Sequence, residues 1–234
     1  GSLLAFLPGQ GEITRVANLL AEKVRDPSVD VAPLYGAMDR AAQDRAVSPA
    51  HAGRRKIVLA TSIAETSLTI EGVRVVIDAG LARVPRYEPD LGLTRLETVR
   101  VSRAAADQRR GRAGRTGPGV CYRLWEQAGD GALQPYAQPE ILSADLSGLV
   151  LDLAQWGVRD PTVLRWLDPP PAPALKEARA MLADIGALDA AGAITDEGRA
   201  VRGFALPPRL ARMMVDAGRA GEAALAAEIA AVLS

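Results

Sequence analysis

The sequence predicts an α/β protein in which a parallel sheet flanked by helices carries an inserted β-hairpin and is followed by helical segments. Three observations predict this class. Short apolar runs alternate with helical patterns in the first part of the chain. Further along, two strand-like runs flank a turn rich in Pro, Asp and Gly. After Pro139 the composition changes to helical patterns separated by proline clusters.

The first four strands are expected where continuous apolar runs occur, at residues 3–7, 29–34, 56–60 and 73–77. Helical patterns cover residues 11–24 and 40–47, and the first of these places apolar side chains at helical spacing on one face. Parallel strands are buried on both faces, so continuous apolar runs joined in this way predict right-handed βαβ units.

The hairpin is expected from residues 83–87 and 93–101, which flank the turn at 88–92. A last strand is expected at 120–125, after Gly117-Pro118-Gly119. Beyond Pro139, helices are expected at 141–156 and 172–185, with the three prolines of 169–171 between them. Two short strands at 187–189 and 193–195 and a short helix from Asp196 then complete a winged-helix pattern.

The final stretch, 209–233, is expected to be helical and to open a larger helical domain. The predicted domains are therefore 1–139 for the sheet, 140–206 for the winged helix and 207–234 for the start of the helical domain.

Composition excludes several kinds of site. The 234 residues carry no formal net charge, which argues against a nucleic-acid-binding tail. Cys121 and His51 are single, so a disulfide framework, a zinc site and a Ser-His-Asp triad all lack parts. The sequence has no apolar run long enough to span a bilayer and no signal-peptide pattern, which predicts a reducing, cytoplasmic location.

An arginine-rich string, Gln108 to Arg115, is the strongest chemical signal. On one helix Gln108, Arg112 and Arg115 would lie at i, i+4 and i+7 and share a face. Two guanidinium groups can neutralise a transferring phosphoryl group, and an amide can orient the attacking water. The alternative is a solvated helix held by surface ion pairs. Gly111 and Gly114 disfavour it, because each glycine costs a helix about 1 kcal/mol relative to alanine.

A second string, residues 60–72, is rich in hydroxyls and follows directly on a predicted strand. Ligands of α/β sheets bind at the carboxyl ends of the strands, and hydroxyls and backbone amides contact phosphate and ribose without reading bases. The alternative is an ordinary cap-and-turn segment, in which Ser and Thr are common.

In this order and spacing, the two strings resemble motifs V and VI of the DEAH-box ATP-dependent RNA helicases. Residues 3–9 resemble motif IV of the same family, and residues 33–36 followed by 43–45 resemble the next segment. Residues 186–189 and 195–199 are similar to the family's winged-helix signature. Residues 145–149 and 156–157 are most similar to its bacterial HrpB-type branch.

The resemblance implies that the chain is the second RecA-like lobe of a helicase motor. Gln108, Arg112 and Arg115 would face the γ-phosphate of ATP, the last two as arginine fingers. Thr61 and Thr66 would touch the nucleic-acid backbone.

Three further residues would surround the nucleotide. Ser67 would lie near it and Glu71 near its ribose. Val47 stands where family members often carry an aromatic that stacks on adenine, so base stacking is expected to be weak and nucleotide choice broad.

The sequence has neither a glycine-rich phosphate loop ending in Lys-Ser/Thr nor an Asp-Glu-Ala-His string. A first RecA-like lobe preceding Gly1 is expected to supply both and to bind most of the ATP and Mg²⁺. The expected function is ATP-driven 3′–5′ unwinding or remodelling of RNA, single-stranded or duplex with an overhang, by the two lobes together. A DNA helicase and a non-catalytic nucleic-acid-binding module remain the alternatives.

Overall fold

The computed structural model describes residues 1–66, 68–89, 91–115 and 117–233 of the chain. The chain divides into two compact units. The first comprises residues 1–84 and 96–137, and the second comprises residues 85–95 and 138–234. Each unit has its own hydrophobic cores and is described in turn.

A five-stranded parallel sheet forms the centre of the first unit, in the order β2-β3-β1-β4-β7. Its strands are β1 (Ser2–Phe6), β2 (Val29–Leu34), β3 (Arg55–Ala60), β4 (Val73–Asp78) and β7 (Val120–Arg123). The predicted parallel sheet is confirmed, although the last strand ends at Arg123 rather than at residue 125. β1 pairs with both β3 and β4, so its side chains alternate between two covered faces.

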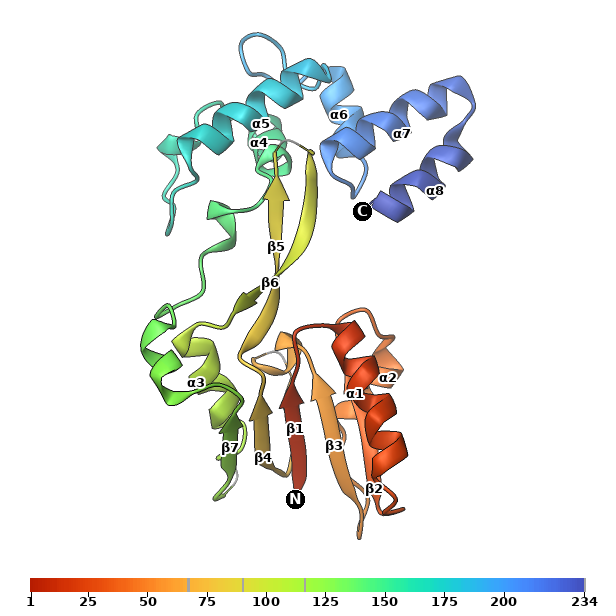
Figure 1. Ribbon diagram of the computed structural model, residues 1–234. Coiled ribbons are helices and arrows are strands. Elements are labelled where there is room, and N and C mark those ends of the chain that lie inside the picture. The colour runs from red at the N-terminus through yellow and green to blue at the C-terminus, as the bar shows by residue number, and fades with distance from the viewer. Residues whose placement is uncertain (67, 90, 116, 234) are drawn as a thin grey trace. The chain divides into compact units, whose positions relative to one another are not determined.

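Helix α1 (Gln10–Lys23) covers one face of the sheet, where Ala5, Ile13 and Leu59 are buried. The opposite face is covered by α2 (Arg40–Val47) and by the segment that follows β3 and begins with the short helix η1 (Ser62–Ala64). In Figure 1, α1 and α2 lie beside β3, and α3 (Arg103–Gly111) lies beside β7. The core of this second face contains Leu4, Phe6 and other apolar side chains from the sheet.

Helix α3 is shorter than predicted. Ser102 caps its start, since its Oγ accepts a hydrogen bond from the Ala105 amide at 3.2 Å. The helix ends at Gly111, and residues 112–114 continue as a turn. There the Arg112 amide donates to the Arg109 carbonyl, three residues back. The glycines at 111 and 114 weaken the helix here, so Arg115 does not lie on it as predicted.

The predicted β-hairpin is confirmed by the pairing of β5 (Leu81–Glu88) with β6 (Leu93–Arg100). Its base belongs to the first unit and its tip, residues 85–95, to the second. At the turn, Gly92 has a φ of +63° and its amide donates to the Glu88 carbonyl at 2.9 Å. A left-handed residue at this position favours glycine.

The second unit is helical around one core formed by α4 (Ser147–Gln155), α5 (Ala172–Asp184), α6 (Asp196–Arg202) and α7 (Pro208–Ala220). The expected wing is reduced to a single antiparallel bridge, Leu188 with Ile194. Three further 3₁₀ turns are η2 (Gln127–Ala132), which belongs to the first unit, and η3 (Glu140–Leu142) and η4 (Pro161–Val163), which belong to the second.

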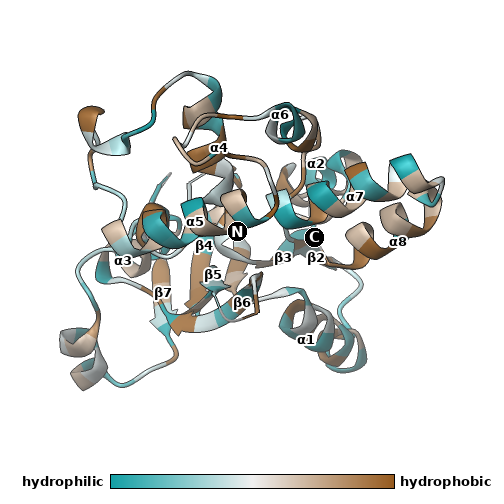
Figure 2. Ribbon diagram, turned by 90° about the horizontal axis from the view of Figure 1, so that it is seen from above, coloured by the Kyte–Doolittle hydropathy of each residue, from teal (hydrophilic) through white to brown (hydrophobic). Residues whose placement is uncertain are grey.

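Two predicted helices are interrupted in the structure. The helix expected at 141–156 is split into η3 and α4. The Asp145 carboxylate accepts hydrogen bonds from the amide and the hydroxyl of Ser147 at 2.9 and 2.6 Å, and α4 begins at Ser147. The helix expected at 209–233 is divided into α7 and α8 (Ala223–Leu233) at Gly221, whose φ is +81°. Figure 2 shows hydrophilic residues along α7, whereas α8 is largely hydrophobic.

The predicted domain boundary at residue 206 has no counterpart in the division into two units. Leu206, Ala211 and Val215 pack into the same core as α4 and α5. Helix α7 therefore shares a core with the winged-helix segment, and the three-domain division stays a prediction.

Candidate functional site

The segment that joins β3 to β4, residues 61–72, runs back along one face of the sheet. Because β1 is parallel to both strands, the segment must travel from the carboxyl end of β3 to the amino end of β4. Ala64 and Ile70 are buried in the core of that face. Only the start of the segment therefore lies at the edge where α/β sheets usually bind ligands.

Arg112 fastens this segment to the end of α3. Its Nε donates to the Glu65 carbonyl at 3.0 Å, its Nη1 to the Leu68 carbonyl at 2.9 Å, and its Nη2 also to the Glu65 carbonyl. Burial lowers the pKa of Arg112, Arg115 nearby lowers it further, and Glu65 opposes the shift. The guanidinium remains a cation at any physiological pH, because arginine starts from a very high pKa.

Three of the predicted site residues lie around one cavity. Glu71, Arg112 and Arg115 line a cavity of about 360 Å³, together with Thr69, Ile70, Gly72 and Val73. Two arginines and one glutamate therefore line the same space. This combination can hold an anionic group and, through the carboxylate, accept a hydroxyl.

The other predicted site residues lie elsewhere in the first unit or outside the described residues. Gln108 is exposed on α3 and does not line this cavity. Thr66 is exposed, and the backbone of Thr61 bonds to Leu34 and Ala64. Ser67 is outside the described residues.

Val47 is half-buried and packs against the core beneath α2. Its side chain is thus engaged in the interior of the protein, and its predicted place beside a base stays a prediction.

Arg109 was not predicted as a site residue, yet its side chain bonds to two carboxylates in this region. Its side chain is 0% exposed and its Nη1 donates to Asp78 Oδ1 at 2.7 Å. Its Nε donates to Glu65 Oε1 at 2.7 Å, and its guanidinium lies 4.9 Å from the centre of the Phe6 ring. A sequence signal existed, because Arg109 follows Ala106 by three residues on the buried side of α3.

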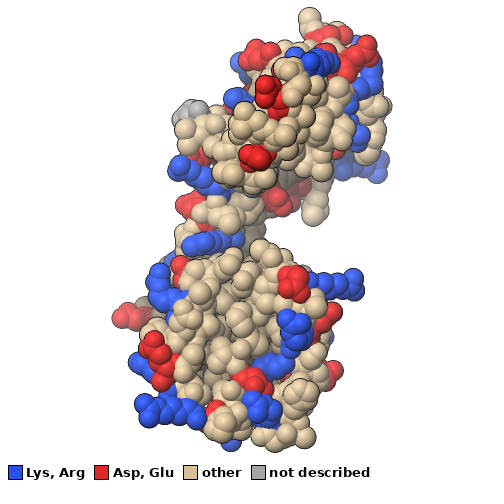
Figure 3. Space-filling model, turned by 90° about the vertical axis from the view of Figure 1, so that its right-hand side faces the viewer, with Lys and Arg blue, Asp and Glu red and all other residues tan. Residues whose placement is uncertain are grey.

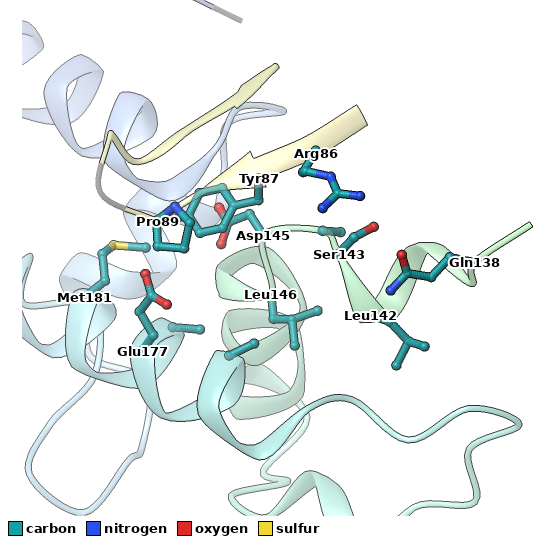
Figure 4. Close-up of a pocket in the computed structure, with 13 residues that line it drawn as sticks. Arg86, Tyr87, Pro89, Gln138, Leu142, Ser143, Asp145, Leu146, Glu177 and Met181 are labelled. Carbon is teal, nitrogen blue, oxygen red and sulfur yellow. The ribbon is translucent and has the colours of Figure 1, made fainter. Parts of the chain in front are cut away.

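A separate cavity of about 250 Å³ lies in the second unit, beside the hairpin tip (Figure 4). Tyr87 and Asp145 line it, and Glu177 and Met181 lie on its α5 side. Burial raises the pKa of Tyr87, and the charges of Asp145 and Glu177 add to the shift. None of the predicted site residues lines this cavity.

Charges of both signs are interspersed on the face of the first unit seen in Figure 3, around an uncharged central area. That face therefore offers no continuous basic strip to a nucleic acid. Among residues 1–66, 68–89, 91–115 and 117–233, no group of three or more His, Cys, Asp or Glu side chains could hold a metal ion. In the same part of the chain, no helix combines the length and apolar character needed to cross a membrane.

Comparison of the sequence with known protein families identifies the family of this chain. The profile of the helicase conserved C-terminal domain matches residues 1–117, which is half of the chain and contains both the segment 61–72 and the arginine string. The chain belongs to the helicase C-terminal domain family. The sheet, the segment held by Arg112 and the cavity lined by Glu71, Arg112 and Arg115 all lie within the first unit, which this match mostly covers.

Full-chain relatives of this helicase domain are RNA helicases by name. The ATP-dependent RNA helicase HrpB of Escherichia coli (strain K12) is 50% identical over 235 residues, covering 100% of this chain and 29% of that protein. The probable ATP-dependent RNA helicase DHX34 of Mus musculus is 40% identical over 216 residues, covering 92% of this chain and 19% of that protein. The chain thus spans less than a third of the length of these two relatives.

Solved structures agree with the sequence matches. A crystal structure of the E. coli DEAH/RHA helicase HrpB has a TM-score of 0.90 and 48% identity, covering 100% of this chain and 30% of that chain. A crystal structure of the E. coli DExH-box NTPase HrpB has a TM-score of 0.83 and the same 48% identity, covering 100% of this chain and 29% of that chain. The α/β fold predicted from the sequence is therefore the RecA-like fold of these helicases.

Proposed function

We propose that this chain is the second motor lobe, with the following winged-helix region, of an ATP-dependent RNA helicase. The observation that carries the proposal is the cavity that Glu71, Arg112 and Arg115 line together. It supports binding of a triphosphate, because two arginine side chains beside one cavity can neutralise the charge that develops on the transferring phosphoryl group.

We assign each predicted site residue a role in the proposed reaction. Arg112 and Arg115 act as arginine fingers, and the amide of Gln108 orients the attacking water. Glu71 accepts a ribose hydroxyl, and Ser67 lies near the nucleotide. Another lobe of the same polypeptide supplies the phosphate loop and the carboxylates that hold Mg²⁺. Because Val47 offers no aromatic ring for stacking, selectivity among the nucleotide bases is weak.

Thr61 and Thr66 contact the nucleic-acid backbone, and cycles of cleft closure and opening move the strand in the 3′–5′ direction. The exposure of Thr66 supports this contact with the backbone. A cytoplasmic location is part of the proposal.

The experiment compares the full-length protein with the isolated chain. The full-length protein should hydrolyse ATP faster with RNA and unwind a duplex that has a 3′ overhang. A matched duplex with a 5′ overhang and an all-DNA duplex are the controls. Equal unwinding of the DNA duplex would favour a DNA helicase, and RNA binding without hydrolysis would favour a non-catalytic module.

The isolated chain of 234 residues should release no phosphate from ATP, with or without RNA, because it has no phosphate loop. Steady-state phosphate release measures this directly. RNA-stimulated turnover by the purified chain would contradict the division of the active site between two lobes.

A further inference from the structure

Arg109 is the largest of the fully buried side chains in the described part of the protein. Burying a guanidinium costs several kcal/mol in lost hydration, so a protein keeps one only with close partners. Asp78, itself 0% exposed, and Glu65, 16% exposed, lie 2.7 and 2.6 Å from Arg109 nitrogens. The carbonyl of Leu81 accepts a further bond at 3.2 Å.

The two carboxylates come from different parts of the first unit. Asp78 ends β4 in the sheet, whereas Glu65 belongs to the segment 61–72 that crosses the face of the sheet. Arg109 itself is on α3. The cation therefore ties the segment, the sheet and the helix together at one point.

Glu65 is also held from its other side. Its carboxylate accepts from Arg109, and its main-chain carbonyl accepts from Nε of Arg112 at 3.0 Å. Arg112 thus has its guanidinium directed at the backbone of the same residue that Arg109 fixes by its side chain. Glu65 cannot shift relative to α3 without changing the hydrogen bonds of Arg112.

The segment carries both proposed ligand contacts. Thr61 and Thr66 flank Glu65, and Glu71 lines the cavity with Arg112 and Arg115. A nucleic-acid phosphate bound at the threonines would act on the chain next to Glu65, and a nucleotide that drew Arg112 toward it would break the hydrogen bond to the Glu65 carbonyl. Coupling of this kind would change the affinities for nucleotide and for nucleic acid by the same factor.

We propose that Glu65 and Arg109 are positioning residues, and that their ion pair couples nucleic-acid binding on the segment 61–72 to the orientation of Arg112. This inference rests on the proposed function and adds the route by which RNA would stimulate hydrolysis. Both residues act through Arg112, which donates to the main-chain carbonyl of Glu65.

The test uses the full-length protein with Glu65→Gln, which keeps the size of the side chain and the carbonyl that Arg112 uses. Hydrolysis without RNA should change by less than about twofold, whereas stimulation by saturating RNA should fall about tenfold, within the usual range of coupling between sites. Arg109→Lys should show the same pattern, because one ammonium cannot reproduce the planar fork that meets both carboxylates.

Asp30→Asn is the matched control. It removes the carboxylate of an exposed ion pair with Arg54 in the same unit, and it should leave RNA stimulation unchanged. If Glu65→Gln lowers both rates in equal proportion, the ion pair only supports the fold and the proposal is wrong. Wild-type stimulation in the variant would also overturn it.

If Glu65→Gln does not fold, amide exchange of the wild-type protein decides. RNA should change exchange in residues 61–72 and also in 103–115, and no change in the latter would overturn the coupling. If the wild-type protein shows no RNA-stimulated hydrolysis, the proposed function fails and this inference fails with it. A failure confined to the variants overturns the coupling alone.

Discussion

Arg112 and Arg115 have different surroundings although the sequence gives them the same predicted role. Arg112 is half-buried and donates to two backbone carbonyls, whereas Arg115 is exposed at the cavity. In the proposed reaction Arg115 would act as an exposed charge beside the cavity, whereas Arg112 would also hold the segment 61–72.

In the full-length protein, Arg115→Ala should lower the rate of ATP hydrolysis by roughly 10³–10⁵, the range measured for arginine fingers, and change ATP binding much less. Arg112→Ala should lower the rate as strongly and also speed amide exchange in residues 65–68. Single-turnover hydrolysis and nucleotide titration separate the two effects. Arg110→Ala is the matched control, because that arginine is 63% exposed and pairs only weakly with Asp107, at 3.5 Å. Near wild-type hydrolysis by Arg115→Ala would show that the finger assignment is wrong.

At the level of single residues, the sequence indicated which arginines line the cavity but not which ion pairs hold the neighbouring elements together. The string 108–115 predicted that Gln108, Arg112 and Arg115 share one face, but only Arg112 and Arg115 line the same cavity, together with Glu71. It did not indicate Arg109, because its partners Glu65 and Asp78 are 44 and 31 residues away in the chain. Such long-range pairs depend on the packing of three elements, which periodicity does not describe.

Among the elements, α2 depends on a buried cation at its end. The Nζ of Lys56, on β3, donates to the carbonyls of Arg45, Ala46 and Ser48 at 2.9, 3.4 and 2.6 Å. The last carbonyls of a helix have no partners within it, so Lys56 supplies the donors that the helix end requires. Burial lowers the pKa of this lysine.

Lys56→Met should reduce the free energy of unfolding by about 1–3 kcal/mol, since it leaves buried carbonyls without a donor. Urea unfolding of the chain measures the loss. Lys23→Met is the control, because Lys23 is exposed in the last turn of α1. Equal stability of the two variants would mean that water satisfies the end of α2.

Helix α6 is joined to α7 by a cluster of charges around Glu197. Its carboxylate oxygens lie 2.7 Å from Arg219 and 2.8 Å from Arg212. The hydrogen bond from Arg219 lowers the pKa of Glu197 below its ordinary 4.5, and the charges of Arg219 and Arg212 lower it further. The folded state therefore holds fewer protons than the unfolded state near that pH.

Stability from this cluster should be fully present above pH 4.5 and lost as the pH falls through the lowered folded-state value. Glu197→Gln should consequently show a smaller fall in melting temperature between neutral and acid pH than the wild-type chain. Thermal unfolding across that range is the measurement. Glu222→Gln, on the loop between α7 and α8, should keep the wild-type pH profile. Parallel profiles for Glu197→Gln and the wild type would contradict the assignment.

Element boundaries were predictable where side-chain pattern decides them and not where backbone hydrogen bonds do. The parallel strands follow from continuous apolar runs, and all of them are found within two residues of their predicted ends. The break at Gly221 depends on a single left-handed residue, and the start of α4 depends on Asp145 capping Ser147. Neither feature alters the apolar spacing on which the prediction rested.

For the whole molecule, the hairpin is the element whose unit is hardest to predict from its position in the sequence. Its strands lie between β4 and α3 in the chain, yet its tip belongs to the second unit. In that unit the Tyr87 amide donates to the Ser143 carbonyl at 3.1 Å, and Gly92 lies close to Arg209. A compact unit can thus recruit a distant segment through contacts that local patterns do not contain.

The two units should unfold as separate cooperative blocks, because each has its own buried core. Leu4 in β1 and Leu182 in α5 are both 0% exposed, so truncation to alanine should cost either unit roughly 3–5 kcal/mol. Trp125 lies in the first unit, and Trp156 and Trp166 lie in the second, so single-tryptophan versions report on each unit alone. In urea, Leu4→Ala should lower only the midpoint seen by Trp125, and Leu182→Ala only the midpoint seen by Trp166. If both midpoints move together in either variant, the chain unfolds as one block and the cores depend on each other.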